Sequence, residues 1–265
     1  MRKSIFEIEN RINITDEYER LINGLFEQDS LIYNSYYMNL YDFINDEVFP
    51  QWKYRGTFTN IYEFLENLGI NIENECDIDE ESFLNFLEFL LNIWNIAKQT
   101  IDFNRIKKIK RIQFNIIDHN IPIILEKMNY KSVFIDDKII IIKRDADVDS
   151  ILNNVPENIS LLLLEYNDIR NHKIGDKKLI IKELDLYIEK DKKRLKSLDS
   201  GLYDSIQTIV NKMGINHPIS DKFSDLTEEN LINWYDKCFK MIIHLLRYKE
   251  INKYKEERKK LVNEK

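Results

Sequence analysis

Residues 79–99, DEESFLNFLEFLLNIWNIAKQ, form the clearest helical pattern in the chain. The apolar residues recur every three or four positions, so they fall on one side of a helix: Phe83, Leu87, Leu90 and Trp94. The other side carries a polar stripe of Asn85, Glu88, Asn92, Asn95 and Gln99. The acidic start at Asp79 suits the positive end of the helix dipole. The pattern therefore predicts a helix that packs one face and exposes the other to water.

The rest of the chain is also expected to be helical. Six glycines and four prolines in 265 residues are too few for a protein built from many tight turns. Further helices are predicted at 15–28, 31–48, 59–68, 104–128, 148–153, 157–168, 177–195, 202–213 and 227–260. In the last of these, an apolar stripe includes Leu231, Trp234, Cys238, Ile242 and Leu245. Beyond Arg247 the chain is highly charged, which indicates a solvated helix with surface salt bridges.

One segment breaks the helical period. The sequence YKSVFIDDKIIIIKRD at 130–145 has two β-branched runs around Asp136-Asp137-Lys138. This pattern predicts a β-hairpin, and a lone hairpin needs helices to lean on. The fold class is therefore all-α, mainly a helical bundle, with one small β-hairpin near 131–143. The hairpin is expected to join an N-terminal helical region, 1–129, to a C-terminal region, 130–265, unless both form a single compact unit.

Composition restricts the compartment and the class of protein. The net charge of -7 describes a mildly acidic protein, and the few glycines argue against the phosphate-binding loops of Rossmann and P-loop enzymes. The N-terminus has no apolar signal region, and the apolar runs are too short to cross a membrane. Cys76 and Cys238 are far apart and are expected to be reduced. We therefore expect a cytoplasmic protein without a membrane partner.

The densest group of potentially catalytic side chains lies in LLLLEYNDIRNHKIGD at 161–176. Arg170 can anchor a phosphate and His172 can transfer protons, with Asn167 and Asn171 beside them. On one continuous helix Arg170 and His172 would point about 200° apart, so they converge only in a loop or with help from a second subunit. A metal site from Glu165, Asp168, His172 and Asp176 is the alternative use of this segment. We expect Gly175-Asp176 to break the helix and therefore predict no metal and no cofactor.

A second polar loop, NKMGINHP at 211–218, is predicted to meet the first. Gly214 suits the end of a helix, and Pro218 forces His217 into an extended conformation. Lys212 and Asn216 would supply further contacts to a substrate. Two basic stretches, at 105–112 and 190–196, are alternative phosphate contacts, although such charge runs also occur as solvated helix faces.

Several segments between residues 130 and 249 occur in a recognisable order. They are Glu165–Asn167, Gly175–Lys178, LDLYIEKDKKRLKSLDSGL at 184–202, Asn211, Ile215–His217 and LINWYDKCFKMIIHLL at 231–246. This order resembles a group of mainly helical proteins of low-GC bacteria and their mobile elements, which is distantly similar to HEPN-type proteins of abortive infection. The resemblance implies a homodimer that cleaves RNA through an arginine four to six residues before a histidine. This chain departs from that motif, because only Lys212 before His217 and Lys237 before His244 approach it.

Two functional hypotheses follow. In the first, the chain is an antiviral, abortive-infection-type protein and a metal-independent ribonuclease. Its catalytic residues are His217, His172 and Arg170, and its RNA-binding residues are Asn167, Asn171, Lys212 and Asn216. In the second, it is a non-catalytic helical interaction module that binds or sequesters a partner protein.

Overall fold

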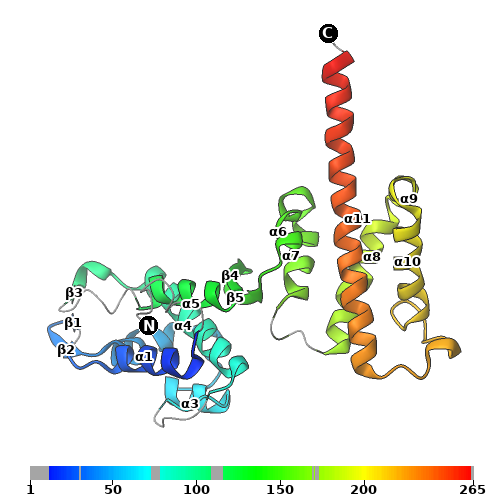
Figure 1. The fold of residues 1–265 in the computed structure, drawn as a ribbon. Helices are drawn as coiled ribbons and strands as arrows, with labels where there is room; N and C mark the ends of the chain where they lie inside the picture. Colours follow the sequence, from blue (N-terminus) through cyan, green and yellow to red (C-terminus); the bar gives the residue numbers. More distant parts are fainter. Residues whose placement is uncertain are drawn as a thin grey trace, which may run out of the picture. The chain divides into compact units, whose positions relative to one another are not determined.

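A computed structural model describes residues 12–29, 31–72, 78–108, 116–168, 170 and 173–263. The chain divides into two compact units, residues 1–141 and 142–265. About 70% of the structure is helical, so the predicted mainly helical fold is confirmed (Figure 1). The N-terminal unit contains the helices α1 (Ile14–Phe26), α2 (Leu40–Phe43), α3 (Ile61–Asn67), α4 (Glu80–Thr100) and α5 (Ile121–Lys127). The C-terminal unit contains α6 (Ala146–Asp149), α7 (Glu157–Tyr166), α8 (Ile174–Glu189), α9 (Lys192–Leu198), α10 (Ser200–Lys212) and α11 (Glu228–Asn263).

Helix α4 forms where the sequence predicted a helix with one packed face, and it lies in the core of the N-terminal unit. Asp79 caps it by accepting a hydrogen bond from the backbone N of Ser82 at 2.7 Å. Its buried residues include Phe83, Leu87 and Leu90, and α1 and the short π-helical turns at 44–48 and 116–120 pack against the helix. These contacts place the apolar face of α4 at the centre of the unit.

A small antiparallel sheet in this unit was not predicted. The strands β1 (Leu31–Tyr33), β2 (Tyr36–Met38) and β3 (Ile106–Lys108) pair in the order β2-β1-β3. The helix predicted at 31–48 is therefore wrong before Leu40, and the one predicted at 104–128 is wrong at β3. Asn34 and Ser35 have φ values of 49° and 73°, which suit a two-residue hairpin turn and not a helix.

The predicted hairpin is confirmed as strands β4 (Tyr130–Ile135) and β5 (Lys138–Lys143). Its turn residues Asp136 and Asp137 also have positive φ, at 46° and 63°. Asn92 of α4 accepts from the backbone N of Ile139 at 2.9 Å and donates to its carbonyl at 2.6 Å. Glu88 accepts from the backbone N of Ile141 at 2.8 Å. The polar stripe of α4 therefore binds the edge of β5 at these two positions and does not only face water.

Substitution of Asn92 by alanine should test this connection. Because the backbone groups of Ile139 lose a partner in a half-buried place, we expect the free energy of unfolding to fall by about 1–3 kcal/mol. Asn95→Ala, about one turn further along the same helix, should change it by less than about 0.5 kcal/mol. Urea unfolding of both variants checks this, and equal losses in the two would contradict the role of Asn92.

The C-terminal unit is built around α11. Helices α8 and α10 pack against α11, and α7 packs against α8. Their shared core includes Leu163, Ile181, Leu184, Tyr203, Ile206, Val210, Cys238, Ile242 and Leu245. Burial raises the pKa of the Cys238 thiol to about 12, in keeping with a structural role. Trp234, which was predicted on the core stripe, is instead 36% exposed, and Tyr235 takes the buried place beside it.

Candidate functional site

The first part of the predicted site is organised by Asp168. This carboxylate is 8% exposed and follows α7 directly. It accepts from the backbone N and Nε of Arg170 at 2.9 and 3.0 Å, and from Nη2 at 2.7 Å. The arginine expected to anchor phosphate therefore already holds an anion of its own chain in a two-pronged grip.

The neighbours of Arg170 are only partly described. His172 and Asn171, two of the predicted site residues, lie outside the described residues. Asn167 accepts from the backbone N of Lys143 at 3.0 Å through its own carbonyl. Its side-chain Nδ2 is buried and makes no hydrogen bond to a described group. Asn167 is thus fixed through its backbone, by the start of the C-terminal unit.

The second part of the predicted site is organised by another carboxylate, Asp185 of α8, which is 2% exposed. Its Oδ2 accepts from Nδ2 of Asn216 at 3.0 Å, and its Oδ1 accepts from Nε2 of Gln207 at 2.6 Å. Burial raises the pKa of Asp185, while the hydrogen bonds from Asn216 and Gln207 act in the opposite direction. Asn216 therefore serves to satisfy a buried acid, and its amide nitrogen is engaged.

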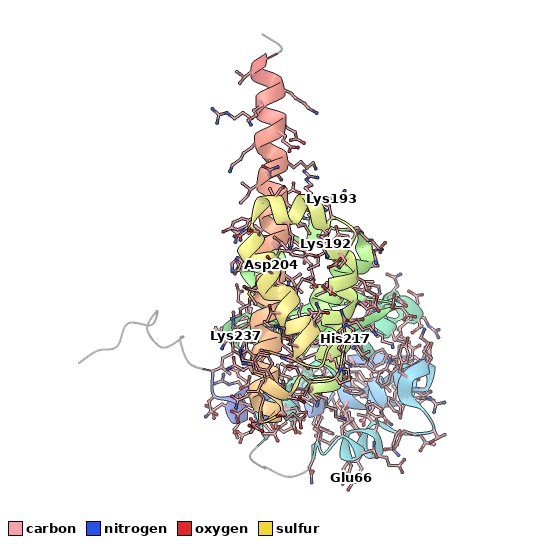
Figure 2. The ribbon with its side chains drawn as sticks, turned by 90° about the vertical axis from the view of Figure 1, so that its right-hand side faces the viewer. Glu66, Lys192, Lys193, Asp204, His217 and Lys237 are labelled. Atoms are coloured by element: carbon pink, nitrogen blue, oxygen red, sulfur yellow. The ribbon has the colours of Figure 1, made fainter. Side chains whose placement is uncertain are left out.

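The loop that carries His217 is fixed by its backbone. Gly214 has φ of 87°, and a Cβ there would lie 2.8 Å from Cγ1 of Ile219. Tyr235 donates to the carbonyl of Met213 at 2.8 Å. His217 and Lys212 are both exposed, and Figure 2 shows His217 away from the end of the unit that holds Lys192 and Asp204. Neither residue takes part in the contacts of Asp168 and Asp185 described above.

The structure gives the two parts of the site separate anchors. Asp168 precedes α8, whereas Asp185 lies eleven residues after Ile174, the first residue of α8. At 1.5 Å per residue this position is about 16 Å along the helix. Arg170 and Asn216 are thus each bound to a different acid, and the hydrogen bonds described here do not join them into one site.

A third polar cluster was missed by the sequence analysis. Asp236 of α11 accepts from the hydroxyl of Tyr166 at 2.8 Å and pairs with Nζ of Lys177 at 2.5 Å. Lys177 also lies over the ring of Tyr166, which stacks on Phe239 at 3.8 Å between centroids. Burial and the nearby Asp236 carboxylate raise the pKa of Tyr166. The cluster connects α7, α8 and α11 through these contacts, and the charges of Lys177 and Asp236 neutralise each other.

The basic stretch at 190–196 is also largely compensated. Lys192 pairs with Glu189 at 3.2 Å, Lys196 with Asp204 at 2.7 Å, and Arg194 with Glu256 at 3.7 Å. Such exposed pairs contribute little to stability. They do reduce the net positive charge that this stretch offers to a phosphate backbone.

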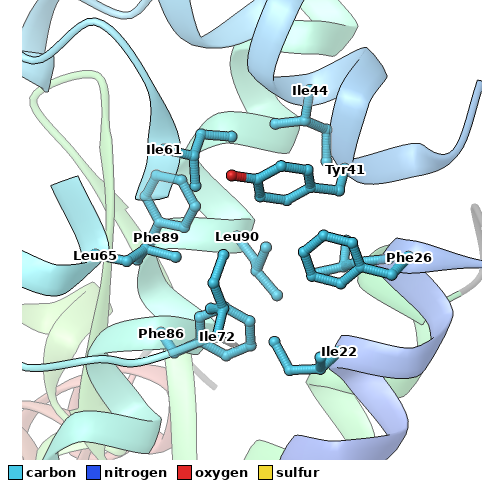
Figure 3. A pocket seen from close by; sticks show the side chains of 11 residues that line it. Ile22, Phe26, Tyr41, Ile44, Ile61, Leu65, Ile72, Phe86, Phe89 and Leu90 are labelled. Atoms are coloured by element: carbon cyan, nitrogen blue, oxygen red, sulfur yellow. The ribbon is translucent and has the colours of Figure 1, made fainter. Parts of the chain in front are cut away.

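A hollow in the N-terminal unit does not offer a ligand site. Figure 3 shows its apolar lining, which includes Ile22, Phe26, Tyr41, Ile61, Phe86 and Phe89. Its cavity volume of about 10 Å³ holds at most one water molecule. The hollow is therefore a feature of core packing.

Comparisons with protein-family models, curated proteins and solved structures found no match. Within the described part of the chain, no three or more His, Cys, Asp or Glu residues gather as a metal site would require. No helix of that part combines the length and the apolar character needed to cross a bilayer.

The pH dependence of the free energy of unfolding tests whether the pKa of Asp185 is raised in the folded protein. Because its pKa in the folded protein is raised above 3.8, its contribution to stability is present below that value and is lost as the pH rises through the raised pKa. The free energy of unfolding of the parent, minus that of Asp185→Asn, should therefore fall as the pH rises from about 4 toward neutrality. Urea titrations across this range measure the difference. A difference that stays constant or rises with pH would contradict the assignment.

A double-mutant cycle should separate a structural role of Arg170 from a catalytic one. We expect Arg170→Ala to lower the free energy of unfolding by about 1–2 kcal/mol, because it leaves the Asp168 carboxylate without its cation. The loss should shrink when Asp168 is also replaced by alanine, which gives a coupling of at least about 0.5 kcal/mol. Lys173→Ala is the control and should have little effect. Additive losses in the cycle would show that the pair does not matter to folding.

Proposed function

We propose that this chain is a non-catalytic helical interaction module that binds a partner protein through its C-terminal unit. The observation that carries the proposal is the state of two predicted site residues, the catalytic candidate Arg170 and the RNA-binding candidate Asn216. Arg170 donates to Asp168 from Nε and Nη2, along one edge of its guanidinium group, and Asn216 donates to the buried Asp185. An RNA phosphate at this arginine would lie beside the Asp168 carboxylate, which repels it and already takes the Nε–Nη2 edge.

The exposed end of α11 supports the same proposal. Leu245 and Leu246 are the last residues of α11 in the core, and the helix continues to Asn263. Past Arg247 it exposes five large apolar side chains: Tyr248, Ile251, Tyr254, Leu261 and Val262. Exposed apolar groups that recur along one element favour a protein interaction. Figure 1 shows this part of α11 extending beyond α9 and α10 of its own unit.

The antiviral, abortive-infection setting remains a proposal that rests on the resemblance described above. A module that binds and sequesters a partner suits such a role without a nuclease site. The ribonuclease hypothesis keeps one observation in its favour, since His217 and Lys212 are both exposed at the end of α10. It needs His172 to approach them, and His172 lies outside the described residues.

Expression in a bacterial host, with and without phage, tests the proposal against the ribonuclease hypothesis. We expect total RNA to stay intact, and any effect on growth or phage to be the same in the parent and in His172→Ala/His217→Ala. His119→Ala, in the other unit, is the control for loss of a surface histidine. RNA cleavage by the parent and the control that disappears in the double variant would contradict the proposal.

A further inference from the structure

The sequence of α11 contains a second stripe besides the one that faces the core. Trp234, Met241, Tyr248, Lys255 and Val262 recur every seven residues, and Lys237, His244, Ile251 and Arg258 follow three residues later. We call these nine residues the outward stripe. Met241 is half-buried and the other eight are exposed. The alternating spacing of three and four residues places all nine on one face, as at the seam of a left-handed coiled coil. Five of them are apolar, and Lys237, His244, Lys255 and Arg258 are the polar members.

The outward stripe points away from the core of its own unit. Ile251 follows the buried Ile242 by nine residues, which is two and a half helical turns. The two side chains therefore leave the helix on opposite sides. Helices α8 and α10 pack on the side of Ile242, and α6 and α9 also contact α11, with Arg247 pairing with Asp147 of α6 at 2.7 Å. The residues of the outward stripe other than Met241 stay exposed.

The side that faces the unit changes character after the core ends. Lys249 and Glu256 follow Ile242 at intervals of seven and lie on its side of the helix. Lys249 pairs with Asp191 at 2.9 Å, and Glu256 pairs with Arg194 of α9 at 3.7 Å. The chain thus uses ion pairs where α11 meets its own unit and places apolar groups on the far side. This distribution is typical of a helix that packs against its own unit on one side and binds another protein on the other.

The charge around the outward stripe is positive throughout its second half. The basic residues there are Lys255 and Arg258 on the stripe and Lys259 on its flank. The acidic residues of this part, Glu250, Glu256 and Glu257, lie 100° or more from Ile251 around the helix. Lys237 also lies over the exposed ring of Trp234, at 4.4 Å. A second copy would set these like charges against each other, whereas an acidic partner would neutralise them.

We infer that the outward stripe docks an acidic amphipathic helix of another protein as a two-stranded coiled coil. The inference rests on the proposed function and names the partner class. From Trp234 to Val262 the stripe rises about 42 Å, which is enough for four heptads. Tyr248, Ile251 and Val262 would supply the apolar contacts. Lys255 and Arg258 would fix the register by pairing with carboxylates of the partner.

A defined peptide tests the inference on the full-length chain. The probe is a fluorescent four-heptad helix with leucine at the core positions and glutamate beside them, and fluorescence anisotropy measures its affinity. Lys255→Glu/Arg258→Glu should weaken binding by about tenfold or more, because it turns attraction into repulsion at the seam. Lys253→Glu/Lys260→Glu makes the same change in net charge on the opposite side of the helix and should weaken it by less than about threefold. Ile251→Ser, which leaves the charge unchanged, should also weaken binding, and circular dichroism checks that all variants fold.

Four results would overturn the inference. They are no saturable binding of the peptide, equal losses in the two charge-reversal variants, equal binding of a scrambled peptide of the same composition, and tighter binding of single-stranded RNA or anionic vesicles through Lys255 and Arg258. The proposed function fails by a different result, histidine-dependent cleavage of RNA. If RNA stays intact and the peptide does not bind, the proposed interaction module is retained and the docking of a helix on the outward stripe is wrong.

Discussion

Burial of the first half of α11 against α8 and α10 is the interaction on which the C-terminal unit depends. Cys238, Ile242 and Leu245 fill the centre of that contact. At about 25 cal/mol per Å² of apolar surface removed from water, such contacts are the main favourable term in folding. The same helix then continues for more than a dozen residues without a core to pack on. A stretch of that length is marginally stable alone, so its persistence as a helix depends on the anchored half and on surface pairs.

Three carboxylates arrange the polar groups around this core. Asp168 holds Arg170, Asp185 holds Asn216 and Gln207, and Asp236 holds Lys177. In each case the acid satisfies or neutralises a group that would otherwise be available to a ligand. Asp168 and Asp185 are buried, so removal of the group that satisfies either acid is costly, and these two contacts favour a fixed structure over catalysis. This is the physical reason for preferring an interaction module to a nuclease.

Much of the fold could be predicted from the sequence, because helical period, caps and hairpin turns are local signals. The cap at Asp79 and the turn at Asp136 were both visible in this way. The strand pairing of β1 with β3 was missed, because it joins segments far apart in the chain. The pairing of Asn216 with Asp185 was missed for the same reason, since 31 residues separate the two. Asp168 lies only two residues before Arg170, but the sequence suggested it as a metal ligand and not as the partner of that arginine. One sequence signal could have identified Asp185 as a buried acid: it lies on the apolar side of its helix, beside Ile181 and Leu184.

The central claim is that the buried side of α11 packs in its own core up to Leu246, whereas the outward stripe, from Trp234 to Val262, docks a partner helix. Amide hydrogen exchange along α11, in the full-length chain alone and with the acidic peptide in excess, tests this claim most directly. The account predicts strong protection at 235–246 in both conditions, and protection at 252–262 that rises only when the peptide is bound. Equal protection of both halves in the free chain, or no change at 252–262 in the presence of bound peptide, would contradict it.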